Sequence, residues 1–207
     1  MARDLDSITH LTFDVGGTVF DWPHGIKDEV TALASAQGVE VDAAQFANDW
    51  RREMFVGLGQ VRSGELPMQN ADALHRRALD IVVPAHAPFE LDAAGRDELN
   101  LVWHRLPMWS DFGDVLPRLR TRFTVSVLTV LSFSLVVESS KHNGLSWDSI
   151  MSCEFLGHYK PDAEAYLAGL KLLGTTPEQT MMVAAHPGDL RASAVAEFQR
   201  AGRMDVG

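Results

Sequence analysis

The sequence predicts an α/β fold: a Rossmann-like parallel sheet flanked by helices, with an all-helical cap inserted after the first strand. An apolar run over residues 8–15 stops at Gly16 and Gly17, as a buried strand does when it ends in a tight turn. Residues 23–105 then show helical periodicity and no strand pattern. From Pro107 onward, β-branched apolar runs alternate with helical stretches, which is typical of a parallel sheet with crossover helices.

The chain is therefore expected to form a core that an insertion interrupts. We assign residues 1–22 and 106–207 to the core and residues 23–105 to the cap. The chain has 207 residues, of which 46% are hydrophobic, and this suffices for a domain of ordinary size with an inserted cap.

The helices of the cap are expected from apolar residues at helical spacing. In the first of them, Ile26, Val30 and Leu33 recur on one side, and Gly38 ends the helix. The expected ranges are 26–37, 42–61, 70–82 and 93–104.

The elements of the core are expected to alternate. Residues 123–130 are rich in β-branched residues and apolar on both faces, as in a strand inside a parallel sheet. The remaining strands are expected at 149–153 and 180–185. The helices are expected at 114–122, 132–143, 161–173 and 189–201.

Composition excludes several classes of partner. A formal net charge of −10 argues against nucleic acid and anionic membrane surfaces. Cys153 is the single cysteine, which excludes an internal disulfide and fits a reducing cytoplasm. Residues 1–6 lack the apolar core of a signal peptide, and no run of about 18 apolar residues predicts a membrane span. We expect a cytoplasmic protein that binds a small molecule.

Polar side chains follow the expected strands at their carboxyl ends. They are Asp14 and Thr18 after the first strand, Thr129 in the second, Lys160 beyond the third, and His186 and Asp189 after the fourth. Ligands of parallel α/β sheets bind at these ends, so we expect one shared site. Taken singly, each has an ordinary alternative: Asp14 suits a turn, Lys160 a solvated loop and Asp189 a helix cap. Convergence from separate segments favours the site.

These motifs resemble those of the haloacid dehalogenase superfamily, hydrolases that use a strand-end aspartate as the nucleophile. The resemblance extends from about residue 8 to residue 202 and rests on residues 13–18, Thr129, residues 159–161 and Asp189.

Within the superfamily, the chain is most similar to the type II 2-haloacid dehalogenases. The spacing from Lys160 to Tyr166 and on to Asp189 resembles that branch, as do Trp50-Arg51 and the histidine-containing run 183–189. The resemblance implies that Arg51 binds the substrate carboxylate and that the protein is a homodimer. For Arg51, the adjacent Arg52 is a rival.

The residues also separate a dehalogenase from a phosphatase of the same superfamily. The resemblance implies that such a phosphatase carries the motif Asp-x-Asp, whose second acid protonates the leaving alkoxide. Gly16 stands at the position of this second acid. Halide is a very weak base and leaves without a proton. A phosphatase also needs Mg²⁺ held by a further carboxylate, where Ala185 stands here. We therefore expect neither metal nor cofactor.

The expected reaction starts with Asp14 attacking the carbon that bears the halogen of a short (S)-2-haloalkanoic acid. Water then hydrolyses the aspartyl ester to release a 2-hydroxy acid with inverted configuration. The supporting roles are expected to be as follows: Thr18 steadies Asp14, Thr129 donates to Asp14 or the substrate, Asp189, oriented by Lys160, positions the water, and His186 acts as base. For Tyr166, core packing and a site hydroxyl are both open.

Some positions depart from the family pattern. Val130 replaces a usual asparagine, Ala184 a frequent serine, and the chain is expected to stop at Gly207, short of the strand that the family adds after its last helix. Two alternatives therefore stay open: a Mg²⁺-dependent small-molecule phosphatase and a catalytically idle family member.

Overall fold

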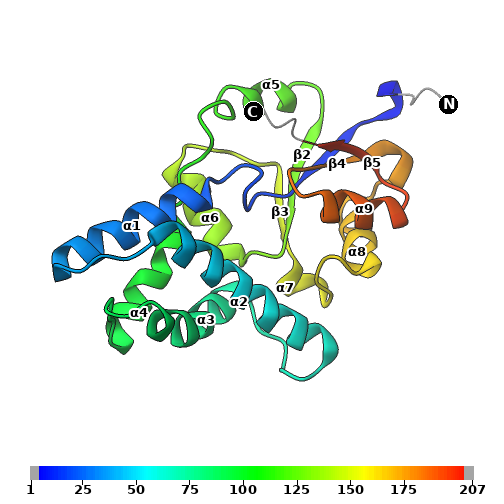
Figure 1. Cartoon of the computed structure of the whole chain (residues 1–207). Coiled ribbons are helices and arrows are strands. Elements are labelled where there is room, and N and C mark those ends of the chain that lie inside the picture. Colours follow the sequence, from blue (N-terminus) through cyan, green and yellow to red (C-terminus); the bar gives the residue numbers. More distant parts are fainter. Residues whose placement is uncertain (1–4, 203–207) are drawn as a thin grey trace. The chain divides into compact units, whose positions relative to one another are not determined.

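The structure is a computed structural model that describes residues 5–202 (Figure 1). It divides into two compact units. The first, unit 1, comprises Met1–Phe20 and Met108–Gly207, and the second, unit 2, is Asp21–Pro107. That unit 2 acts as a cap over the site of unit 1 stays a prediction, and each unit is described by itself.

Unit 1 is built on a parallel sheet, which confirms the predicted α/β class. Its strand order is β3-β2-β1-β4-β5, and all four neighbouring pairs are parallel. The strands are β1 His10–Phe13, β2 Thr124–Thr129, β3 Ser149–Ser152, β4 Thr180–Ala184 and β5 Gln199–Gly202. β1 lies in the middle, where both neighbours hydrogen-bond to it.

The helices of unit 1 connect these strands. They are η1 Leu5–Ser7, α5 Val115–Arg120, α6 Phe133–His142, α7 Cys153–Leu156, α8 Ala163–Leu173, η3 Pro177–Gln179 and α9 Pro187–Val195. The short helix α7 was not expected. Its first turn is capped by the Ser152 hydroxyl, which accepts from the Glu154 N–H, and Gly157 ends it in the left-handed region.

The end of the described chain corrects the prediction. The expected helix 189–201 is wrong, because α9 stops at Val195 and β5 follows it. Glu197 takes a φ of 64°, which a helix does not allow. Phe198 is buried, with its ring centroid 5.9 Å from that of Tyr166. The expectation that the chain stops before a strand following the last helix is therefore also wrong.

One face of the sheet carries a continuous apolar core under α8 and α9, which lie side by side in Figure 1. Alternation along β4 decides which residues enter it: Met182 and Ala184 are fully buried there, whereas Met181 and Val183 face the other way and are half-buried. The core on the α8–α9 face is formed by Leu128, Met151, Tyr166, Leu170, Met182, Ala184, Ala196 and Phe198.

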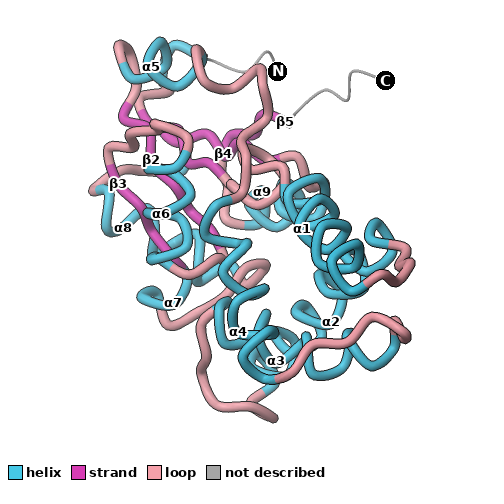
Figure 2. The backbone as a smooth tube through the Cα atoms, turned by 90° about the vertical axis from the view of Figure 1, so that its left-hand side faces the viewer, coloured by secondary structure: helices cyan, strands magenta, loops and turns pink. Residues whose placement is uncertain are grey.

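Unit 2 is helical throughout, as Figure 2 shows by the absence of strands among these segments. Its elements are α1 Trp22–Gln37, α2 Ala43–Ser63, α3 Ala71–Ala85, α4 Ala93–Asn100 and η2 Leu101–Arg105. The expected helix 93–104 is thus an α-helix followed by a 3-10 helix. No helix among residues 5–202 combines the length and the apolar character that crossing a membrane requires.

Candidate active site

Asp14 directly follows β1, and the backbone holds it against the neighbouring strand. Its N–H donates to the Val183 carbonyl at 3.0 Å, which continues the β1–β4 pairing by one residue. The residue is only 6% exposed. The Thr18 hydroxyl donates to Asp14 Oδ2 at 2.9 Å and accepts from the Ala185 N–H at 2.9 Å. Thr18 therefore links the carboxylate to the end of β4.

A buried ammonium lies between two carboxylates at this strand end. Lys160 Nζ is 3.6 Å from Asp14 Oδ1 and 2.9 Å from Asp189 Oδ2. The Tyr166 hydroxyl donates to the other oxygen of Asp189. Tyr166 is fully buried, so it serves in core packing and in the site together. Lys160 and Tyr166 thereby hold both oxygens of Asp189.

Burial and pairing shift the pKa values of this cluster in identifiable directions. Burial raises the pKa of Asp14 above its ordinary value, and the attraction of Lys160 opposes this rise without cancelling it. Burial alone would lower the pKa of Lys160, but Asp189 and Asp14 together raise it. Lys160 therefore keeps its charge, and Asp14 is a poorly solvated carboxylate with the basicity that a nucleophile needs.

His186 lies next to this cluster, at the start of α9. Its Nε2 is 2.8 Å from the Gly16 carbonyl oxygen and 3.8 Å from Asp14 Oδ2. A carbonyl oxygen can only accept, so the proton is assigned to Nε2 in this arrangement.

Thr129 is fully buried at the end of β2, and its hydroxyl oxygen accepts from the Leu131 N–H at 3.1 Å. This contact stabilises the turn after β2. Donation from Thr129 to Asp14 or to a substrate stays a prediction.

Arg51 lies in unit 2, on α2. Its guanidinium carbon is 5.0 Å from the ring centroid of Trp22 and 4.7 Å from that of Phe55, so two aromatic side chains flank a planar cation. Arg52, the rival in sequence, forms ion pairs with Asp49 and Glu53. The cavity beside Arg51 has a volume of about 510 Å³ and is lined by Trp22, Asn48, Arg51, Arg52, Phe55 and Val56.

No protein-family model matches this sequence, and no curated protein matches it either. Solved structures do match. The L-2-haloacid dehalogenase PA0810 is 30% identical, with a TM-score of 0.88 over 94% of this chain and 83% of that chain. The defluorinating L-2-haloacid dehalogenase Rha0230 is 33% identical, with a TM-score of 0.88 over 94% of this chain and 80% of that chain.

The chain belongs to the L-2-haloacid dehalogenases, the type II branch of the haloacid dehalogenase superfamily. The resemblance seen in the sequence is confirmed, and the chain is a hydrolase of the haloacid dehalogenase type. An L-2-haloacid dehalogenase from Xanthobacter autotrophicus, solved with chloropropionic acid covalently bound, is 18% identical. Its TM-score is 0.81 over 94% of this chain and 77% of that chain, a likeness in fold alone.

The superfamily also contains magnesium-dependent enzymes, so we tested whether these residues fit a magnesium ion. They do not. Magnesium prefers octahedral oxygen ligands, and the position between Asp14 and Asp189 is taken by the Lys160 ammonium. Among the residues that the structure describes, no group of three or more His, Cys, Asp or Glu side chains suits a metal.

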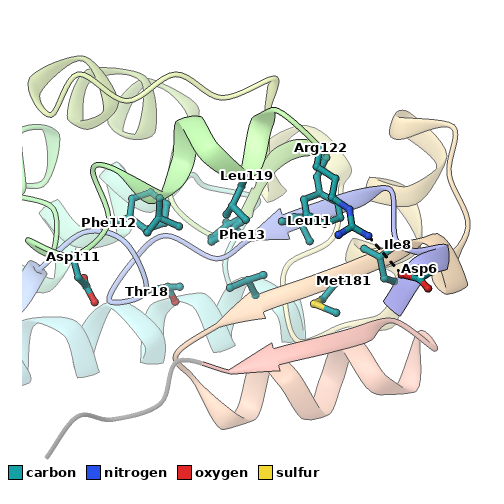
Figure 3. Close-up of a pocket in the computed structure, with 13 residues that line it drawn as sticks. Asp6, Ile8, Leu11, Phe13, Thr18, Asp111, Phe112, Leu119, Arg122 and Met181 are labelled. Carbon is teal, nitrogen blue, oxygen red and sulfur yellow. Dashed lines mark ion pairs between the residues drawn. The ribbon is translucent and has the colours of Figure 1, made fainter. Parts of the chain in front are cut away.

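A larger cavity, of about 700 Å³, lies on the sheet face opposite α8 and α9 (Figure 3). Its walls are mostly apolar side chains of β1, β4 and α5, and at one end Arg122 lies 3.8 Å from Asp6. It shares Thr18 with the site, but Asp14 is not among its lining residues. The cavity therefore reaches Thr18 without being lined by Asp14.

Sequence reasoning missed one contact of interest in each unit. One is the aromatic partner of Arg51 at Phe55, which the i to i+4 spacing on a helix could have indicated. The other is Trp109, whose indole N–H donates to the Gly17 carbonyl at 3.0 Å. No local signal in the sequence indicates the second contact, because the two residues are far apart in the chain.

Proposed function

We propose that this protein is a hydrolytic dehalogenase of short 2-haloalkanoic acids, which forms an aspartyl ester and releases a 2-hydroxy acid and halide. The observation that carries the proposal is the buried Asp14, held by Thr18 and paired with the Lys160 ammonium. Family membership supports the same class of reaction.

In the first step, a carboxylate oxygen of Asp14 forms a bond to carbon 2 as the carbon–halogen bond breaks. Halide leaves with the bonding electron pair and needs no proton. Gly16, two residues after the nucleophile, offers no general acid, which suits this leaving group. Arg51 binds the substrate carboxylate, for which a planar guanidinium between aromatic rings is well suited.

In the second step, water attacks the carbonyl carbon of the ester. Asp189 positions this water and takes its proton. The Lys160 ammonium stabilises the negative charge that develops on the carbonyl oxygen of the ester. The bond from the carbonyl carbon to the alkyl oxygen then breaks, and the alkoxide leaves as the 2-hydroxy acid after it takes up the proton. Asp14 is regenerated with one oxygen from water once the second proton of that water passes to solvent. Configuration therefore inverts once, at the first step.

Neither alternative is supported by a specific observation. For a magnesium-dependent phosphatase, residues 5–202 offer no fitting donor set. A catalytically idle member would explain Val130 and Ala184, but it leaves the paired Lys160 without a role. A homodimer and a cytoplasmic location stay predictions, and light scattering coupled to gel filtration checks the first.

The test is halide release from chloro-, bromo- and fluoroacetate and from both enantiomers of 2-chloropropionate, without added metal and with a chelator. We expect release by the wild type and none by Asp14→Asn. Asp114→Asn is the matched control, because Asp114 is exposed and lies in the same unit. A single turnover in ¹⁸O water should place the label in Asp14 before it reaches product.

An unlabelled Asp14 after turnover would exclude the ester route. Release of phosphate that needs Mg²⁺ and Asp14 would support the phosphatase. Inertness toward all of these substrates, by a folded protein, would support the idle member.

A further inference from the structure

The loop that follows Asp14 is held by side chains from two distant segments. The Gly16 carbonyl accepts from His186 Nε2 at 2.8 Å, and the Gly17 carbonyl accepts from Trp109 Nε1 at 3.0 Å. On the other side, the Gly17 N–H donates to the Phe20 carbonyl at 2.9 Å. Two successive peptide groups are thus fixed by aromatic N–H donors.

These contacts are needed because two adjacent glycines are the most flexible pair that a chain can place there. Gly17 requires this freedom, since its φ is 89°. Gly16 does not, because its φ lies outside the left-handed region. A Cβ at Gly16 would lie 3.4 Å from Leu131 Cδ1, which is van der Waals contact with a flexible side chain. Gly16 therefore adds mobility beside Asp14, although its own backbone conformation does not require glycine.

The contact with Gly16 also decides what His186 can do. Its Nε2 carries a proton in order to donate to the carbonyl, and this nitrogen is the one that lies 3.8 Å from Asp14. A nitrogen that is already protonated cannot take a proton from water. The earlier expectation that His186 acts as base conflicts with this geometry.

We propose that His186 and Trp109 are positioning residues that clamp the Gly16–Gly17 loop and so hold Asp14 in its attacking geometry. His186 acts through its N–H and not as a base. The catalytic consequence rests on the proposed dehalogenase function, whereas the clamp itself rests on the two hydrogen bonds.

Substitutions at His186 separate a donor from a base. His186→Gln places an amide N–H near the position of Nε2 and cannot act as a base, whereas His186→Ala removes both properties. Because misplacement of a nucleophile by about 1 Å can reduce a rate about 100-fold, we expect kcat of His186→Ala to fall about 10- to 100-fold. His186→Gln should recover most of this loss, with the pH profile of the wild type and an unchanged KM.

A base at position 186 would give the opposite pattern. Both variants would then be equally slow, and the acidic limb of the pH profile would disappear from both. That result overturns the proposal.

Trp109 and Gly16 provide two further tests. Trp109→Phe keeps a ring and removes the indole N–H, and we expect kcat to fall about three- to tenfold, as for the loss of one hydrogen bond.

Gly16→Ala restricts the loop backbone directly. Combined with His186→Ala, it should recover about two- to fivefold of the lost rate, because alanine removes conformational freedom where its backbone fits. No recovery would argue against loop mobility as the cause.

A readout independent of activity is hydrogen–deuterium exchange of the peptide that covers residues 10–20. The Val19 and Phe20 amides both donate to the Val15 carbonyl and report the order of the loop. They should exchange faster in His186→Ala and Trp109→Phe, and at the wild-type rate in His186→Gln and in the control His142→Ala, an exposed histidine of the same unit.

Unchanged exchange in His186→Ala would overturn the clamp, whatever the activity. The wild type could also release no halide while His186→Ala and Trp109→Phe exchange faster than it does. That result would leave the clamp standing and reject the dehalogenase function.

Discussion

The two units treat a buried titratable side chain in opposite ways. In unit 1, Lys160 is buried between Asp14 and Asp189, and these carboxylates raise its pKa. In unit 2, His75 is fully buried and stacks on Trp103, with ring centroids 3.8 Å apart. Within residues 5–202, neither ring nitrogen of His75 has a hydrogen-bond partner, and burial lowers its pKa to about 3.

The difference follows from what each unit does with charge. A charge is kept inside unit 1 because counter-charges compensate its desolvation, and such an arrangement suits a reacting site. In unit 2 the histidine serves as a neutral aromatic ring, within a core that includes Phe46, Trp50 and Trp103. Removing a partner of the buried ion cluster should therefore destabilise unit 1, and protonating His75 should destabilise unit 2.

The largest effect is expected from Lys160→Met. It leaves two buried carboxylates without their cation, which should lower the free energy of unfolding by about 3–5 kcal/mol and abolish halide release. Urea unfolding followed by circular dichroism measures the loss. Part of the stability should return at acidic pH, as Asp14, whose pKa burial raises, becomes protonated. Lys141→Met, at an exposed lysine of α6, is the control. Equal stability of the two variants would contradict the view that Lys160 compensates buried charge.

Acidification tests unit 2. The folded pKa of His75 is about 3 and the ordinary value is 6.5, so the unfolded chain binds more protons between these values. The contribution of neutral His75 to the free energy of unfolding is complete above pH 6.5 and is lost as the pH falls from 6.5 toward 3. The loss is about 2 kcal/mol at pH 5. Urea unfolding at a series of pH values measures this slope. His75→Phe should flatten the slope and keep the stacking, whereas His142→Ala should not change it.

A smaller effect, on substrate affinity, is expected from Arg51→Lys. The charge remains, but the planar group between Trp22 and Phe55 is lost, so KM should rise about 10-fold or more with little change in kcat. Steady-state kinetics with 2-chloropropionate measures it. Arg105→Lys, at an arginine paired with Glu29 in the same unit, is the control. A fall in kcat at unchanged KM would place Arg51 outside substrate binding.

The smallest effect concerns helix caps, in which α5 of unit 1 differs from the α-helices of unit 2. The α-helices of unit 2 begin at residues whose side chains accept a backbone N–H, namely Asp21, Asp42, Asn70 and Asp92. At the start of α5 in unit 1, Asp114 makes no such bond. Asp92→Ala should therefore lower the free energy of unfolding by about 1 kcal/mol. Asp114→Ala should change it by less than about 0.5 kcal/mol, as surface substitutions usually do.

Local pattern determined the architecture. Periodicity of 2 and 3.6 residues is carried by neighbouring side chains, so the alternation of strands and helices could be predicted without knowing any distant contact. The convergence of Asp14, Lys160 and Asp189 also followed, because parallel strands bring their carboxyl ends to one edge of the sheet. The boundary of α9 could not be predicted, since it depends on Phe198 packing against Tyr166.

Only the tertiary structure decided which atoms meet. Arg51 and Arg52 are adjacent and chemically alike, and only through-space contacts, with Trp22 for Arg51 and Asp49 for Arg52, distinguish their surroundings. Likewise, the proton on His186 follows from the Gly16 carbonyl, 170 residues away in the chain. A sequence specifies the residue types that reach a strand end. The hydrogen-bond partner of each depends on the packing of distant segments, which no local pattern records.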